Sequence, residues 1–288
     1  MTDKRNKAEW ITDLIEGFVA SQENGLGNSS DERMFGVPLV GFAAGDDPLF
    51  EQFKRDIGSF YLTPVEAFEK AFPGTTVEPE KLTVISWILP HVEQTKSDSR
   101  KEKDRPSERW ARGKQLGVLI NVKLQKYLIE KITATGYRAM APCSPPFWSE
   151  RISERFGRSS TWSERHAAYV AGLGTFGLCD GLITSAGKAM RCGSLIAQIE
   201  VPATVRPYQK HTEYCLFLSQ GICGVCMKRC PVGAITEKGH DKEKCKAHVD
   251  GVCVDYSKEH YGIDINVCGL CQTGVPCESR IPLKNSRH

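Results

Sequence analysis

Hydrophobic positions in the first half of the chain predict helices alternating with buried strands. Near the N-terminus they recur every three or four residues, which is typical of an amphipathic helix; these positions are Trp10, Ile11, Leu14, Ile15, Phe18 and Val19. Residues 37–44 and 82–89 are short apolar runs rich in β-branched residues, so each predicts a buried strand. Between these strands, Thr63-Pro64 indicates a helix start, because proline is tolerated in the first turn.

The second half continues this alternation and then changes character. Residues 93–109 are charged and contain Pro106, which favours a solvated loop, whereas residues 112–133 have the periodicity of a long helix. We expect strands at 137–141, 181–184 and 194–201, and a short helix from Ser163 that runs into a glycine-rich turn. The prolines at 202 and 207 indicate a boundary. The pattern therefore predicts a mixed α/β domain over residues 1–205 and a cysteine-rich domain over 206–288.

Length and composition limit the class of protein. With 288 residues, 40% of them hydrophobic, the chain can build one large domain or two ordinary ones. The net charge of +3 does not by itself indicate a nucleic-acid partner. No apolar run approaches the roughly 18 residues of a membrane span, and the start lacks the apolar core of a signal peptide. We expect a cytoplasmic protein without a membrane partner.

Cysteines carry the main chemical signal. Nine of the twelve lie between Cys215 and Cys277. Cys223, Cys226 and Cys230 form C-x2-C-x3-C, with proline next and then Val-Gly-Ala-Ile, and a second C-x2-C group lies downstream. Two such groups, one ending in Cys-Pro, predict a pair of [4Fe-4S] clusters, each of which needs four thiolates. Structural zinc also uses paired C-x2-C units and is the alternative.

In ferredoxin-type sequences the cysteine before proline binds the other cluster, so the predicted ligand sets are crossed. The first set is Cys215, Cys223, Cys226 and Cys277. The second set is Cys230, Cys245, Cys268 and Cys271. Cys215 takes the place of the usual cysteine at Gln220, and Cys253 competes with Cys245 for the remaining place in the second set.

A glycine turn follows the short helix. Gly172, Gly174 and Gly177 fit G-x-G-x-x-G only loosely and follow a helix instead of a strand, so a Rossmann phosphate site is not favoured. Glycines permit left-handed angles and a close approach of the backbone to a ligand. The turn is therefore a predicted ligand surface.

Together these motifs resemble the epoxyqueuosine reductase family and, more distantly, reductive dehalogenases. The resemblance covers about residues 80–280 and rests on Glu164, the glycine turn, Leu182-Ile183, Gly193-Ser194 and the cysteine groups with Cys-Pro-Val-Gly-Ala-Ile. It implies a mixed-sheet nitroreductase-like domain that binds cobalamin, followed by a ferredoxin-like double [4Fe-4S] domain. It also implies a low-potential electron donor such as ferredoxin or flavodoxin, and a modified tRNA nucleoside as substrate.

The resemblance also suggests site residues. The cofactor-binding residues would be Gly172, Gly174, Gly177 and Ser194. Arg158, Glu164 and His166 are the candidate catalytic groups, although His166 is equally well explained as a histidine on a solvated helix face. Cys179 and Cys192 lie beside the predicted cofactor surface, or are simply buried small side chains.

Three departures separate the chain from that family. Arg158-Ser159 stands where the family has an Asp-Thr pair that includes its proposed proton donor, and the glycine turn continues as Thr175-Phe176-Gly177-Leu178-Cys179. The sequence ends at His288, without the helical repeats that longer relatives use for tRNA.

The sequence thus predicts an iron-sulfur oxidoreductase that relays electrons through two clusters to a cobalamin, with an unknown substrate; tRNA is a candidate. The alternative is an electron-transfer or maturation partner without substrate chemistry of its own. A zinc-ribbon nucleic-acid binder is a third reading, and it lacks the expected basic, aromatic surface.

Overall fold

The computed structural model describes residues 4–27 and 32–282. At its centre is a four-stranded sheet with the order β1-β2-β8-β3. The strands are β1 (Leu39–Ala44), β2 (Thr83–Pro90), β3 (Ala139–Met140) and β8 (Met190–Ala197). All three pairings are antiparallel, which corrects the expectation of a mixed sheet. The reason lies in the connections: Ala44 at the end of β1 is paired with Thr83 at the start of β2, so the chain between them leaves and returns at one end of the sheet.

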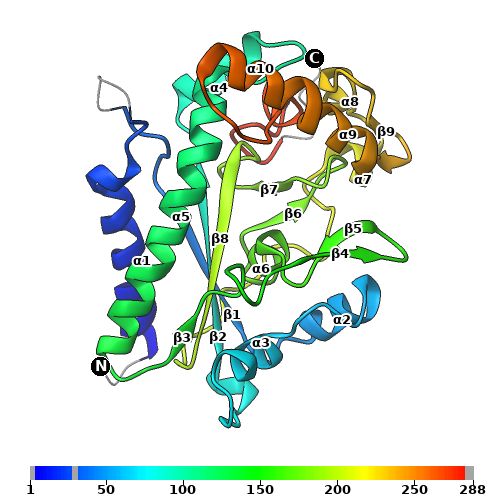
Figure 1. Cartoon of the computed structure of the whole chain (residues 1–288). Coiled ribbons are helices and arrows are strands. Elements are labelled where there is room, and N and C mark those ends of the chain that lie inside the picture. Colours follow the sequence, from blue (N-terminus) through cyan, green and yellow to red (C-terminus); the bar gives the residue numbers. More distant parts are fainter. Residues whose placement is uncertain (1–3, 28–31, 283–288) are drawn as a thin grey trace.

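Side chains alternate between the two faces of this sheet, as strand geometry requires. In β2, Ile85, Trp87 and Leu89 face one hydrophobic core, whereas Val84 and Ile88 face another. The first core is covered by α1 (Lys4–Ala20) and the long α5 (Glu108–Ala134), which run side by side in Figure 1. The second is covered by α2 (Pro48–Ile57), α3 (Pro64–Ala71) and α6 (Glu164–Val170).

Local sequence explains where the covering helices begin. Thr63 and Glu66 form a reciprocal capping box at α3, with Pro64 at the first helical position. Asp47, Ser107 and Ser163 each accept a backbone hydrogen bond as N-cap residues of α2, α5 and α6. The placement of α6 brings Glu164 beside Ser194 and Arg191 of β8.

Two hairpins complete the first part of the chain. The strands β4 (Glu150–Ser153) and β5 (Gly157–Ser160) form one, and β6 (Gly174–Phe176) and β7 (Leu182–Thr184) form the other. The chain then enters β8 and passes through residues 202–207. Thr204 exchanges two hydrogen bonds with Phe42 in β1, so this segment is attached to the sheet edge. A domain boundary near residue 205 stays a prediction.

The cysteine-rich segment contains short elements joined by turns. They are α7 (Leu216–Gln220), α8 (Val225–Arg229), β9 (Ile235–Thr236), β10 (Gly239–His240), α9 (Lys242–His248), a π-helical turn (Val249–Cys253), α10 (Val254–Tyr261) and a 3-10 turn (Leu270–Gln272). Figure 1 shows the segment gathered at one end of the molecule, beside α4 and the adjacent end of β8. That end holds Met190 paired with Pro90.

Most predicted elements of the first part are confirmed, with two corrections. The strand expected at 194–201 is β8, which begins and ends four residues earlier. Residues 93–101 form the helix α4 (Glu93–Lys101), not a solvated loop. Its inward face is polar: the Ser99 hydroxyl contacts the Thr273 hydroxyl at 2.9 Å, and Arg100 pairs with the buried Glu278. A helix that docks through polar side chains has no apolar stripe to announce it. Within the described residues, no helix is long and apolar enough to cross a membrane.

Candidate metal and active site

The two predicted cysteine sets line two different cavities. Cys215, Cys223, Cys226 and Cys277 lie around a small cavity of about 20 Å³. Cys230, Cys245, Cys268 and Cys271 lie along the wall of a larger cavity of about 480 Å³. The crossed sets are thus each gathered in space, including Cys230, which is separated from its set by the chain order. That the thiols bind iron stays a prediction.

Arg229 fixes the helix that carries the first cysteine group. Its guanidinium donates to the carbonyl of Thr273 at 3.1 Å, to that of Glu102 at 2.8 Å and to that of Ser99 at 3.1 Å. These bonds join α8 to the C-terminal loop and to the end of α4. Because that loop also carries Cys268, Cys271 and Cys277, the two cysteine groups are held in a fixed relation.

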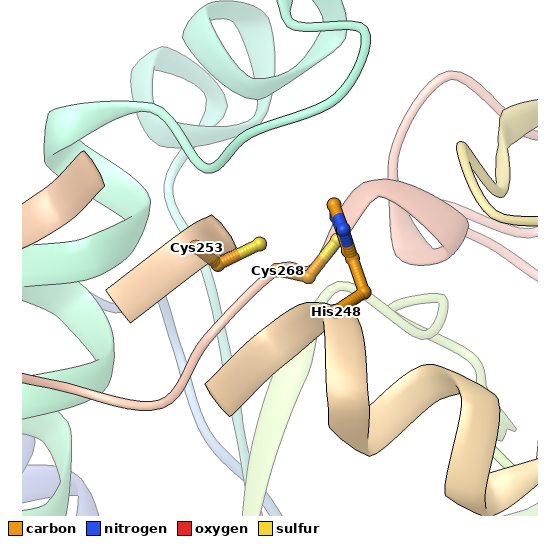
Figure 2. Close-up of side chains that lie close together, drawn as sticks. All are labelled: His248, Cys253 and Cys268. Carbon is orange, nitrogen blue, oxygen red and sulfur yellow. The ribbon is translucent and has the colours of Figure 1, made fainter. Parts of the chain in front are cut away.

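Cys253 remains an alternative to Cys245. The sulfur atoms of Cys253 and Cys268 and a ring nitrogen of His248 lie within 4.8 Å of one another, close enough to hold one metal ion. Figure 2 shows the His248 ring beside the Cys268 sulfur, with Cys253 facing them from the following turn. Cys253 is fully buried and is not part of the cavity lining, whereas Cys245 is. Thiol and imidazole donors at this separation also suit zinc.

His240 flanks the second set. Its Nδ1 lies 3.0 Å from a carboxylate oxygen of Asp180, and its ring is near Cys245. The hydrogen bond to Asp180, followed by that to Cys245, raises the pKa of His240 to about 10. A charged imidazole therefore stands next to a predicted cluster ligand.

The large cavity is also lined by charged side chains of the α/β part. Glu164 and Arg165 come from the start of α6, Arg191 from β8, and Lys114 from α5. Burial, followed by the charges of Arg191 and Arg165, lowers the pKa of Lys114 to about 8. The wall thus combines one carboxylate with several cations.

Glu164 has the environment of a proton donor. Both of its carboxylate oxygens are buried and lack a hydrogen-bond partner of good geometry among the described residues. Burial raises the pKa of Glu164 to about 7, although nearby Ser194, Cys143 and Arg191 favour the ionised form. A carboxyl group with a pKa near neutrality can hold a proton and release it at working pH.

The other two catalytic candidates lie elsewhere. Arg158 is on β5 and forms ion pairs with Glu150 and Glu243. His166 packs against Phe53 with ring centroids 4.6 Å apart, and burial lowers its pKa to about 3. Neither is part of the described lining of the large cavity. His166 is therefore a packed, neutral histidine rather than one on a solvated helix face.

The local structure explains the residue types found at the predicted cofactor-binding positions. A Cβ at Gly174 would lie 2.3 Å from the carbonyl oxygen of Ile183 in the partner strand, so only glycine fits there. Gly172 has a positive φ of 79°, and Gly177 borders the small cavity. Ser194 is buried and accepts a hydrogen bond from the Trp162 ring at 3.0 Å. Their contact with a cofactor stays a prediction.

Cys179 and Cys192 both line the large cavity. Burial raises the pKa of Cys192 to about 12, as expected of a buried neutral thiol. Sequence reasoning missed Lys114, Lys188 and Arg191, which also line it. Their only sequence signal is a charge next to an apolar strand or on a long helix, which many surface residues share.

No protein-family model matches the chain, and no curated protein matches it significantly. Solved structures do. The fold is that of epoxyqueuosine reductases and reductive dehalogenases. One match is an epoxyqueuosine reductase crystallised with an epoxyqueuosine-modified tRNA-Tyr stem loop, with 14% sequence identity and a TM-score of 0.53. The alignment covers 98% of this chain and 68% of the reductase chain.

Two dehalogenases match as well. A B12-dependent reductive dehalogenase matches 99% of this chain at 16% identity and a TM-score of 0.55. A catabolic reductive dehalogenase in complex with 3-bromo-4-hydroxybenzoic acid matches 96% at 15% identity and a TM-score of 0.50. The chain spans only 34% and 38% of these two proteins. At such identities the likeness establishes the fold, and the predicted resemblance to both families is confirmed at that level.

Proposed function

We propose that this protein is an iron-sulfur oxidoreductase that brings electrons and protons together in the large cavity. One observation carries the proposal: the second cysteine set and the buried carboxyl group of Glu164 line the same cavity. Reduction of an organic substrate consumes both electrons and protons. A site that supplies electrons from thiolate-bound clusters and protons from a side chain matches that requirement.

The residues present fit two [4Fe-4S] clusters. The small cavity is bordered by four cysteines, and the large one by six, four of which form the second predicted set. Four soft ligands are the number that each cubane requires. When bound, the clusters would transfer single electrons, and a corrinoid in the large cavity would supply the reactive metal. The corrinoid is proposed because the cavity is large, has unpartnered polar atoms at its wall, and occurs in the fold of a B12-dependent dehalogenase.

The protein's own groups would then bind and protonate. Glu164 would hold a proton on a carboxylate oxygen near neutral pH. Arg191 and Arg165 would attract an electron-rich or anionic part of the substrate. The buried Trp110 and the neutral His91, whose pKa burial lowers to about 3, would keep water out of that end of the cavity.

A modified tRNA nucleoside is the first substrate class to test. Its support is the fold shared with a reductase crystallised on a tRNA stem loop. The proposed electron donor is a small low-potential protein such as ferredoxin or flavodoxin.

An electron-transfer or maturation partner is the second candidate function. The observation in its favour is Arg158, which stands where the resemblance expects the region of the proton donor and is engaged in surface ion pairs instead. On that account no corrinoid binds, and Glu164 has no catalytic role.

Titration of the anaerobically reconstituted protein with a cobalamin, followed by its absorption spectrum, separates the two functions. Gly181→Leu is the blocking variant, because Gly181 lines the cavity and a Cβ there makes only ordinary contacts, the nearest being Cys179 Sγ at 3.4 Å. Gly17→Leu on α1 is the matched control, since its Cβ meets nothing within 4 Å. We expect the wild type and the control to bind cobalamin saturably. Gly181→Leu should lose cobalamin binding and retain its iron. Absence of binding by the wild type would contradict the oxidoreductase proposal.

A further inference from the structure

Lys188 is held in a fixed position between the α/β part and the C-terminal loop. Its backbone N–H donates to the carbonyls of Cys277 at 2.9 Å and Glu278 at 3.1 Å. The preceding Gly187 has φ of 81°, and a Cβ there would lie 2.1 Å from the Glu278 carbonyl oxygen. The close approach of the two segments therefore depends on glycine, and it delivers the Lys188 side chain to the cysteines.

The side chain of Lys188 is buried between the two cysteine sets. The residue is 3% exposed, and its ammonium donates to Cys179 Sγ at 3.2 Å. Lys188 is the residue that the linings of the small and large cavities share. Its electrostatic neighbours include thiols of both sets: Cys226 and Cys277 of the first, and Cys271 of the second.

Cys179 occupies the space between the sets without belonging to either. It is buried, and it interacts electrostatically with Cys226 from the first set and with Cys271 from the second. Since each predicted set already supplies four cysteines at its cavity, Cys179 is not required as a ligand. It is instead the hydrogen-bond acceptor that places the Lys188 ammonium between the two sites.

A buried cation is costly unless negative charge compensates it. Thiolate-bound iron-sulfur clusters carry such charge, and it increases on reduction. Nearby charge and hydrogen bonding are among the factors that set cluster potentials, and a fixed positive charge in a poorly solvated interior acts over several ångströms. We infer that Lys188, positioned by Cys179, raises the reduction potentials of both clusters and so tunes the electron relay between them. This inference rests on the proposed function, because it requires a cluster at each cavity.

The test is an anaerobic redox titration monitored by electron paramagnetic resonance, with iron content measured on the same samples. Lys188→Met removes the charge and keeps most of the aliphatic chain, whereas Lys188→Arg keeps the charge. Lys123→Met is the matched control for net charge, because Lys123 is exposed on α5 and pairs with Glu23. Cys179→Ala removes the acceptor.

We expect every variant to retain about eight iron atoms, four in each cubane. Lys188→Met should shift both midpoint potentials to more negative values, Cys179→Ala should shift them in the same direction by less, and Lys188→Arg and Lys123→Met should stay near the wild type. Unchanged potentials in Lys188→Met would overturn the inference, and so would loss of four iron atoms in Cys179→Ala, since Cys179 would then be a ligand. Lys188→Gln is a second uncharged variant, and loss of iron in both it and Lys188→Met would likewise replace the tuning role with a structural one. A wild-type protein without iron-sulfur clusters would instead refute the proposed function itself.

Discussion

Replacing Glu164 by glutamine should make the folded protein more stable at alkaline pH. The substitution preserves the shape of the side chain and removes its charge. In the native protein, burial disfavours the carboxylate and raises the pKa of Glu164 from its ordinary 4.5 to about 7. A site that favours protonation opposes folding once the group must ionise.

The magnitude follows from proton linkage. Between pH 4.5 and about 7 the unfolded chain has lost the Glu164 proton and the folded chain keeps it. The favourable contribution is therefore complete below pH 4.5 and is lost as the pH rises through about 7. At roughly 1.4 kcal/mol per pH unit the loss amounts to about 3 kcal/mol.

Anaerobic urea unfolding of wild type and Glu164→Gln at several pH values from about 4.5 to 8 measures this contribution. We expect the stability of the variant relative to wild type to rise by about 3 kcal/mol over that interval. Glu69→Gln, on the exposed side of α3, is the matched control. A constant difference between wild type and Glu164→Gln across the interval would refute the buried proton donor.

Three further substitutions test the metal ligands and the glycine turn. Cys230→Ala should remove the cluster of the large cavity and leave the other, because Cys230 lies with the second cysteine set; spectroscopic loss of the small-cavity cluster would contradict the crossed assignment. Cys245→Ala should lose about four iron atoms and Cys253→Ala none, and iron analysis giving the reverse would make Cys253 the ligand. Gly174→Val should lower the free energy of unfolding by at least about 1–3 kcal/mol, since its Cβ would collide with the carbonyl of Ile183; a variant with unchanged denaturation would show that this turn tolerates a side chain.

The sequence predicts β1 and β2 closely, because each is a short, mainly apolar run, and both faces of β2 are buried. The two predicted cysteine sets line two different cavities, and their role as cluster ligands stays a prediction. The sequence cannot predict α4, whose inward contacts are the polar Ser99 and Arg100.

Parts of the site depend on contacts between residues that are distant in the sequence, and only folding brings these residues together. Glu164 becomes a buried carboxyl group because β8 brings Ser194 and Arg191 beside it. Lys188 meets Cys226 and Cys271, which are far from it in the sequence. At Gly174 the residue type correctly signals a close backbone approach. The sequence does not reveal the neighbour, which is the Ile183 carbonyl of the adjacent strand.

Iron and acid-labile sulfide analysis of the anaerobically reconstituted protein tests the central claim most directly. Two cubanes predict about eight iron and eight sulfide per chain, with no zinc in place of the iron. A single zinc ion bound through His248, Cys253 and Cys268, with iron and sulfide absent, would contradict the account.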